Sequence, residues 1–343
     1  MDASIRFREK RRRLEVPPSN FLNRVGRRLS PAKNIGMPEV EAKTRISMKR
    51  PGNRFGVDAK RDVRDFLPSG ETRLFPVVGD PIEQVKSPSA ITRILAAHGE
   101  NAIVVPMHVG AADLGHLVEA LTKVHNVDGI LVTVPHKFAA LGYCASATER
   151  ARFAGSANVI RKIENGWCGD NTDGMGFLDG IAREGFDIVG KSALLIGCGG
   201  AGSAIAFEIL ERGASELAIH DIDVARRDDI VVRLDARFPG KVRSGSDDPT
   251  GFDFVANATP MGMRPGDPLP VDVSRLGAGQ FVACVVTKPE VPPLIAEARL
   301  RGCGTMTGTG MFDAQAETLV DFLLQSAADH AATHVTIGVS SPE

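Results

Sequence analysis

Short apolar runs alternate with stretches that carry apolar residues at helical spacing, and this pattern becomes regular from residue 75. Runs of strand length cover residues 75–78, 102–105, 129–134, 157–163, 192–196, 217–219, 253–256 and 280–286. Stretches of helical character cover residues 87–98, 111–124, 174–184, 203–212, 293–301 and 311–328, with a shorter one beginning at Lys137. Strands that alternate with helices usually pair in parallel through βα crossovers. The pattern therefore predicts an α/β protein with parallel-rich sheets.

The most informative segment joins one of these strands to a helix through glycines. The run at 192–196 continues into Gly197-Cys198-Gly199-Gly200-Ala201-Gly202, a G-x-G-x-x-G pattern, and Asp221 follows nineteen residues after the last glycine. In such a unit the first glycine permits a tight turn, the second lets the backbone approach a pyrophosphate, and the third allows close helix–strand packing. The helix N-terminus offers free N–H groups to the phosphates. We therefore predict a Rossmann-like dinucleotide site. Asp221 favours NAD there, because a carboxylate repels the 2′-phosphate of NADP.

Composition places the chain among ordinary globular proteins. Its 343 residues suffice for two domains, and hydrophobic residues make up 43% and charged residues 24%. No apolar run reaches the length of a membrane span, and the N-terminus lacks the apolar core of a secretory signal. The five cysteines form no C-x-x-C pair and have no histidines at metal-ligand spacing, so we expect reduced thiols, no metal and a cytoplasmic location.

The first 70 residues differ from the rest in charge. They carry 18 Lys and Arg against 8 Asp and Glu, whereas the whole chain has a net charge of −1. Without a sustained apolar period, such a segment buries too little surface to offset its ordering entropy. It is a basic extension that we expect to be disordered, or translation begins downstream, for example at Met48. A nucleic-acid arm is the alternative that we favour less.

Polar residues that follow strands are candidates for chemistry, because ligands of open α/β sheets bind beyond the carboxyl ends of the strands. Lys137 follows the run at 129–134 and a proline turn. A glycine-bounded turn at 169–174 then holds two acids, of which the second is Asp173. A lysine beside a carboxylate suits proton transfer during the oxidation of an alcohol. Spacing alone does not pair these two residues.

Eight segments in order resemble the shikimate/quinate dehydrogenase family from about residue 74 to residue 325. They are Gly79-Asp80-Pro81-Ile82, Lys86-Ser87-Pro88, Val132-Thr133-Val134-Pro135-His136-Lys137, Ala157-Asn158, Gly169-Asp170-Asn171-Thr172-Asp173-Gly174, the glycine pattern, Asn257-Ala258-Thr259-Pro260-Met261-Gly262-Met263, and Gly310-Met311 with Gln315-Ala316. The resemblance implies a substrate-binding domain at 71–173 plus 311–328 and an NAD-binding, Rossmann-like domain at 174–310. Residues 1–70 and 329–343 would then be an extension and a tail of little structure.

The resemblance also implies roles for individual residues. Lys137 would be the catalytic lysine that moves the substrate's hydroxyl proton, with Asp173 as its partner. Ser87 would bind the substrate carboxylate, and Thr133, Asn158 and Gln315 would bind ring hydroxyls, although an ordinary buried amide remains an alternative for the last two. Together with the glycine pattern, the predicted cofactor contacts are Gly197, Gly199, Gly200, Ala201, Gly202, Asp221, Asn257, Ala258, Thr259, Met263 and Gly310. His136 is expected to have no role.

Three departures from the family pattern make the predicted substrate pocket more apolar. Val85 stands where the family usually has the first of two serines, Leu131 where it has an asparagine, and Val159 where it has a threonine. Losing the first hydroxyl removes a charge-assisted hydrogen bond to a carboxylate, worth roughly 1.5–3 kcal/mol. Many members also have a tyrosine near residues 286–289, where this chain reads Val-Thr-Lys-Pro. At the cofactor site, His220-Asp221-Ile222-Asp223 replaces the Asn-Arg-Thr type of sequence found in NADP-using members.

The expected function is therefore an NAD-dependent dehydrogenase for a ring-hydroxylated carboxylate. Shikimate is the first candidate and quinate the second, and aminoshikimate-like compounds or other polyols stay open because of Val85 and Leu131. A binding or regulatory protein of the same fold is the alternative of a different class, and another dinucleotide enzyme such as a tetrahydrofolate dehydrogenase is a weaker one. The expected partner is a small-molecule substrate, with neither membrane nor nucleic acid, and the expected state is a monomer or homodimer.

Overall fold

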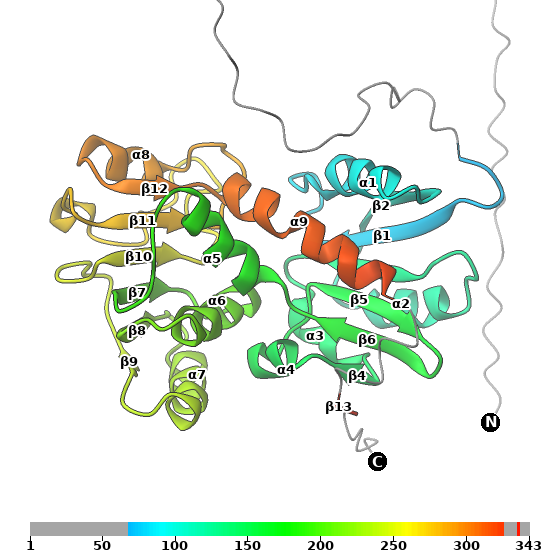
Figure 1. The fold of residues 1–343 in the computed structure, drawn as a ribbon, viewed down its shortest axis with the longest axis horizontal. Coiled ribbons are helices and arrows are strands. Elements are labelled where there is room, and N and C mark those ends of the chain that lie inside the picture. The colour runs from blue at the N-terminus through cyan, green and yellow to red at the C-terminus, as the bar shows by residue number, and fades with distance from the viewer. Residues whose placement is uncertain (1–67, 326–334, 337–343) are drawn as a thin grey trace, which may run out of the picture. The chain divides into compact units, whose positions relative to one another are not determined.

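The computed structural model describes residues 68–325 and 335–336, which form two sheets with helices packed against both (Figure 1). The basic extension at 1–67 and most of the tail at 329–343 lie outside the described residues. Within the described part of the chain, no helix is long and apolar enough to cross a membrane.

The first sheet has seven strands and mixed pairing. In spatial order it contains β13 (Val335–Thr336), β4 (Ser146–Ala147), β6 (Gly166–Asp170), β5 (Val159–Ile163), β3 (Gly129–Val132), β1 (Arg73–Gly79) and β2 (Ala102–His108). β2, β1 and β3 are parallel, whereas β5 runs antiparallel to both β3 and β6. The carboxyl ends of β1 and β3 therefore lie at one edge, next to the loops that enter and leave the β5–β6 hairpin.

The second sheet is a six-stranded parallel sheet. In spatial order it contains β12 (Gly304–Met306), β11 (Phe281–Cys284), β10 (Phe254–Asn257), β7 (Ser192–Ile196), β8 (Glu216–His220) and β9 (Val242–Ser244). All its pairings are parallel, and the strand order changes direction at β7, as in the doubly wound dinucleotide-binding fold. Neighbours along β7, such as Leu194 and Leu195, are both fully buried and belong to different core clusters. This burial on both faces explains why the strands read as continuous apolar runs.

Helices cover the faces of both sheets. In chain order they are α1 (Ser87–Ala97), α2 (Leu114–Thr122), α3 (Lys137–Gly142), α4 (Glu149–Ala154), α5 (Asp173–Arg183), α6 (Gly200–Glu211), α7 (Val224–Arg237), the short 3₁₀ helix η2 (Val273–Arg275), α8 (Pro293–Leu300) and α9 (Gly308–Leu324). The helices α1 and α9 share a core cluster with the first sheet, while α5, α6 and α7 share another with the second. α9 begins beside the second sheet, packs along α5 and ends over the first sheet (Figure 1).

The predicted α/β class is confirmed, but several elements differ from prediction. The segment at 169–174 is not one turn: Gly169 and Asp170 end β6, and Asp173 already begins α5. Its glycines and polar residues suggested a loop because they did not show that the chain here is a buried strand paired with β5. The last helix begins at Gly308, three residues before the predicted Met311, so it includes Gly310. In the predicted tail, Val335–Thr336 pair with β4.

Candidate active site

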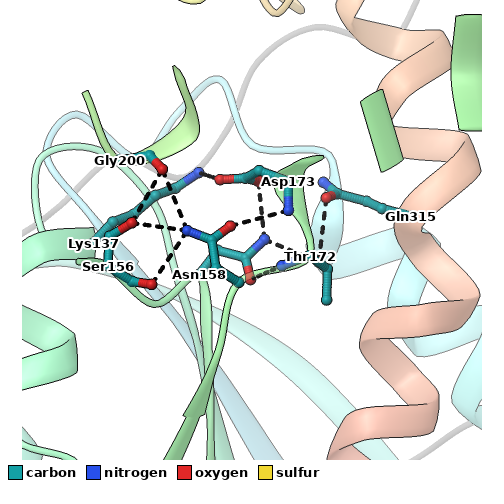
Figure 2. Close-up of polar contacts among 8 residues, drawn as sticks. Lys137, Ser156, Asn158, Thr172, Asp173, Gly200 and Gln315 are labelled. Carbon is teal, nitrogen blue, oxygen red and sulfur yellow. Dashed lines mark hydrogen bonds and ion pairs between the residues drawn. The ribbon is translucent and has the colours of Figure 1, made fainter. Parts of the chain in front are cut away.

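Lys137 and Asp173 are brought together at the carboxyl-end edge of the first sheet. β3 ends at Val132, and after a short turn Lys137 becomes the first residue of α3. Asp173 is likewise the first residue of α5, where the helix dipole favours a carboxylate. Lys137 Nζ donates a hydrogen bond to Asp173 Oδ2 at 2.5 Å, and the two side chains point toward each other (Figure 2). With side-chain exposures of 14% and 3%, the pair is largely withdrawn from water, which strengthens their attraction.

The amide of Asn158 holds the carboxylate from its other side. Asn158 Nδ2 donates to Asp173 Oδ1 at 2.9 Å and to Thr172 Oγ1 at 3.0 Å, and Asn158 Oδ1 accepts from the Thr172 backbone N–H at 3.0 Å (Figure 2). Thr172 Oγ1 in turn donates to Gln315 Oε1 of α9 at 3.4 Å. Both amides are buried. Both donor hydrogens of Asn158 are thus used within the protein, so only its oxygen has acceptor capacity left for a ligand.

The remaining predicted substrate residues lie around the same edge but make fewer polar contacts. Thr133 directly follows β3, and its backbone N–H donates to Val78 O at 2.9 Å. Ser87 is buried at the start of α1, whose preceding loop carries Val85. Leu131 is 3% exposed and packs in the core cluster shared by the first sheet, α1 and α9. His136 also has a structural place, since its Nε2 lies 2.7 Å from the carbonyl oxygen of Val109.

Two further residues, Asn171 and Ser156, belong to this network and were not predicted as site residues. Asn171 Oδ1 accepts from the Asp173 backbone N–H at 3.1 Å, and Asn171 Nδ2 donates to Ser156 Oγ at 2.9 Å. The position of Asn171 inside the Gly-Asp-Asn-Thr-Asp-Gly motif was the available signal. Nothing in the sequence near Ser156 indicated its contact with Asn171.

The glycine pattern forms the turn between β7 and α6. Gly197 has φ +90°, a conformation that L side chains rarely adopt. A Cβ on Gly202 would lie 2.0 Å from the Gly197 carbonyl oxygen, so only glycine fits there. A Cβ on Gly199 would meet nothing within 4 Å, so the space beside it is open. These three geometries agree with a tight turn, close packing and an accessible backbone at the N-terminus of α6.

The loop after β10 packs against this turn. A Cβ on Gly197 would lie 2.6 Å from Thr259 Cγ2, and a Cβ on Gly202 would lie 3.3 Å from Ala258 Cβ. Asn257 Oδ1 accepts from the Thr259 hydroxyl at 2.7 Å and from its backbone N–H at 3.0 Å, which fixes the loop. Met263 lies farther along this loop, against the core beside α8.

Asp221 lies one residue beyond β8 and contacts the same turn. Its Oδ2 accepts from the Cys198 backbone N–H at 2.8 Å, and its Oδ1 accepts from the Asp223 backbone N–H at 2.8 Å. Burial by itself raises the pKa of Asp221, but these two backbone hydrogen bonds, the Cys198 thiol and Arg226 outweigh it, so the pKa lies below its ordinary value. The carboxylate is therefore charged at neutral pH.

No cluster of three or more His, Cys, Asp or Glu side chains within the described residues could hold a metal ion. All five cysteines are buried and free.

Comparison with known proteins identifies the relatives of this chain. Residues 77–160 match the profile of the shikimate dehydrogenase substrate binding domain. A shikimate dehydrogenase (NADP(+)) of Jannaschia sp. is 35% identical over 257 residues, which cover 74% of this chain and 90% of the relative. One of Acidiphilium cryptum is 34% identical over 253 residues, covering 72% and 89%.

Solved structures agree with the sequence matches. A shikimate dehydrogenase in complex with NADP+ superimposes with a TM-score of 0.69 at 25% identity and covers 75% of this chain and 92% of its own. The quinate dehydrogenase from Corynebacterium glutamicum in complex with NAD gives a TM-score of 0.66 at 26% identity, covering 74% and 94%. The ligand-free 5-ketofructose reductase of Gluconobacter sp. gives 0.65 at 27% identity, covering 75% and 95%. The resemblance found in the sequence is confirmed: this chain belongs to the shikimate dehydrogenase family of oxidoreductases.

Proposed function

We propose that this protein is an NAD-dependent dehydrogenase that interconverts shikimate, or a similar hydroxylated ring carboxylate such as quinate, with its 3-dehydro ketone. The observation that carries this proposal is the buried contact of 2.5 Å between Lys137 Nζ and Asp173 Oδ2. A family member without turnover would have no need to keep a buried ion pair in this place. The pair therefore favours an enzyme over the binding or regulatory alternative.

Lys137 and Asp173 handle the proton of the reacting hydroxyl. When the alcohol becomes a ketone, the C–H bond gives its hydride to the cofactor and the O–H bond gives its proton to a base. Because an ammonium group has no free electron pair, Nζ first gives one proton to Asp173 Oδ2, which lies close enough for direct transfer, and the resulting amine then takes the proton of the substrate hydroxyl. Asn158 keeps the carboxylate oriented toward the lysine. In the reverse direction, the same pair returns a proton to the forming alkoxide.

The residues around the turn after β7 fit a bound dinucleotide. The backbone beside Gly199 is open, and the N-terminus of α6 presents N–H groups to a pyrophosphate. When bound, the nicotinamide accepts or donates the hydride. Both curated relatives described above are named for NADP, so the preference for NAD rests on Asp221 of this chain. Its charged carboxylate suits the hydroxyls of an NAD ribose and repels a 2′-phosphate.

A division of labour between two domains follows from this proposal. Residues 71–173 with the last helix hold the substrate, through Ser87, Thr133, Asn158 and Gln315. Residues 174–310 hold the cofactor. Gly310 lies in the first turn of α9, packed beside Met306. It is the last residue of the proposed cofactor domain, at its junction with the substrate domain.

A neutral polyol or ketose is the second candidate substrate. Leu131 and Val159 belong to one core cluster and Val85 packs against it, so the three departures from the family pattern all extend the same apolar core. With Val85 in place of a serine, Ser87 is the one hydroxyl left of that pair to bind a carboxylate. The similar 5-ketofructose reductase is named for a substrate that has no carboxylate.

The test is a kinetic screen that includes a matched lysine control. Purified protein is incubated with NAD or NADP and with shikimate, quinate or neutral polyols, and absorbance in the nicotinamide band is followed. Lys137→Ala should lower kcat at least about a hundredfold, the usual scale for a general acid–base group. Lys123→Ala should not, because Lys123 directly follows α2 and forms an exposed i,i+4 pair with Glu119. Absence of turnover with every substrate, or full activity of Lys137→Ala, would contradict the proposal.

A further inference from the structure

The carbonyl oxygen of Gly200 is a meeting point between the glycine turn and the residues around the catalytic pair. Gly200 is the first residue of α6. Its oxygen accepts hydrogen bonds from Ser156 Oγ at 3.1 Å and from Asn171 Nδ2 at 3.3 Å (Figure 2). Neither donor belongs to the second sheet: Ser156 precedes β5, and Asn171 follows β6. The turn that we propose for the cofactor phosphates is therefore attached directly to the segment that carries Asp173.

Asn171 uses every group of its amide in this attachment. Its oxygen accepts the backbone N–H of Asp173 at 3.1 Å. Its nitrogen donates to Ser156 Oγ at 2.9 Å and lies 3.3 Å from the carbonyl oxygens of both Ser156 and Gly200. Asn171 as a whole residue is 1% exposed. One buried amide thus contacts the first residue of α5 and the first residue of α6 at the same time.

Packing makes the attachment stiff. A Cβ built on Gly200 would lie 3.1 Å from Lys137 Cβ and 3.3 Å from Ser156 Cβ. The backbone of the turn is therefore already in close contact with the base of the catalytic lysine. Because packed contacts of this kind resist compression, a displacement of the turn also displaces Lys137 or Asn171.

We infer that Asn171 is a positioning residue which, together with Ser156, transmits the position of the glycine turn to Lys137 and Asp173. Cofactor binding at the turn and substrate binding at the catalytic pair are then coupled, and linkage makes this coupling equal in both directions. The inference rests on the proposed function, because it takes the turn as the cofactor site and the pair as the reaction site. It adds a role for two residues that touch neither ligand in the proposal.

The test compares Ser156→Ala and Asn171→Ala with a serine control. Ser192→Ala serves as the control for the first variant. Ser192 Oγ also lies within hydrogen-bond distance of a backbone carbonyl, that of Gly251 at 3.3 Å, besides Asp253 Oδ2 at 3.0 Å, but it lies at the start of β7. Binding of NADH is measured by nicotinamide fluorescence, and binding of shikimate by calorimetry with and without NADH. Hydrogen exchange of residues 171–175 and 197–202 is followed with NADH alone.

In the unmodified protein, we expect NADH to change shikimate affinity by about fivefold or more, the lower range of measured couplings. In both test variants, NADH should change shikimate affinity by less than about twofold. Each variant should weaken NADH binding itself by no more than about threefold. NADH should slow exchange at 171–175 in the unmodified protein and in Ser192→Ala, but not in Asn171→Ala, while 197–202 stays protected in all. The pH–rate profile should shift in Asn171→Ala and stay in place in Ser192→Ala.

Two failures have different meanings. If NADH binds but residues 171–175 show no protection, or if protection and coupling persist in both test variants, the inference is wrong and the proposed function stands. If NADH does not bind the unmodified protein, the cofactor site itself is wrong, and both proposals fall. If shikimate does not bind, the exchange experiment with NADH still decides the inference.

Discussion

Leu131 is the position at which the structure most sharpens a prediction drawn from the sequence. It lies in the middle of β3, in register with Val77 of β1 and Val159 of β5, and it is 3% exposed. Its side chain packs in the same cluster as Val85. Replacing Leu131 by asparagine, the residue that the family resemblance suggests for this position, therefore changes the core as well as the pocket.

The cost of this substitution can be worked out from the burial. Removing a fully buried leucine side chain loses about 1.5–3 kcal/mol of transfer free energy. A buried amide without a partner costs about 1–3 kcal/mol more. The free energy of unfolding should thus fall by roughly 2.5–6 kcal/mol, a large part of the 5–15 kcal/mol that domains usually have. A hydrogen bond to a substrate hydroxyl returns only about 1 kcal/mol.

Urea unfolding with and without shikimate measures both effects. Leu131→Met is the matched control and should cost less than about 1.5 kcal/mol, because it conserves volume. Val85→Ser should lower the free energy of unfolding less than Leu131→Asn does, because Val85 is only partly buried. In Val85→Ser with Leu131→Asn, the KM for shikimate should fall if shikimate is the native substrate, by about 1 kcal/mol for each recovered hydrogen bond. A loss of stability below about 1 kcal/mol in Leu131→Asn would refute the assignment of this side chain to the packed core. An unchanged or higher KM in the double variant would refute shikimate and favour the neutral substrate.

Three further predictions follow from the cofactor site and the cysteines. NAD should be preferred over NADP by about tenfold or more in kcat/KM, and Asp221→Asn should narrow that gap because it removes the charge repulsion; equal use of both cofactors by the unmodified protein would contradict this. Because the pKa of Asp221 is lowered by folding, its ionised form stabilises the fold above the unfolded pKa of about 4, and this contribution is lost as pH falls. The unfolding free energies of the unmodified protein and Asp221→Asn should therefore differ by a constant amount from pH 7 to about 5 and converge below about pH 4. A difference that grows in acid would mean that the ionised carboxylate destabilises the fold. Burial raises the pKa of Cys144 to about 12, so a thiol reagent should label it at neutral pH only on unfolding, and rapid labelling of the folded protein would contradict its burial.

The sequence was most informative where local patterns carry their own physical cause. Short apolar runs predicted the strands of a parallel-rich sheet, and the structure has buried strands at three of these runs, in β7, β10 and β11. Gly197 predicted a tight turn and Gly202 predicted close packing of helix and strand, because only glycine allows either. The structure has both geometries. Such features depend on a few neighbouring residues, so they can be predicted without knowing the fold.

Strand β6 and the start of α5 could not be predicted from local patterns of this kind. Residues 166–170 contain two glycines and an aspartate, and they form a strand because β5 pairs with them as a hairpin. Asp170 can end a buried strand because Arg150 of α4 forms an ion pair with it and Thr148 donates a hydrogen bond to it at 2.6 Å. These partners are about twenty residues away, and local propensity contains no information about them.

The contact between Lys137 and Asp173 shows how both kinds of information combine. Each residue was a candidate because of its place beyond a strand, but their spacing of 36 residues did not pair them. The pairing arises because α3 and α5 both begin at the same edge of the first sheet, one after β3 and one after β6. At that edge the network extends through Asn171 and Ser156 to the first residue of α6. Three helix N-termini meet here, and one set of hydrogen bonds joins a lysine, a carboxylate and the glycine turn that we propose for the cofactor phosphates. Under the coupling that we infer, a displacement of that turn by a bound cofactor also displaces Lys137 and Asp173.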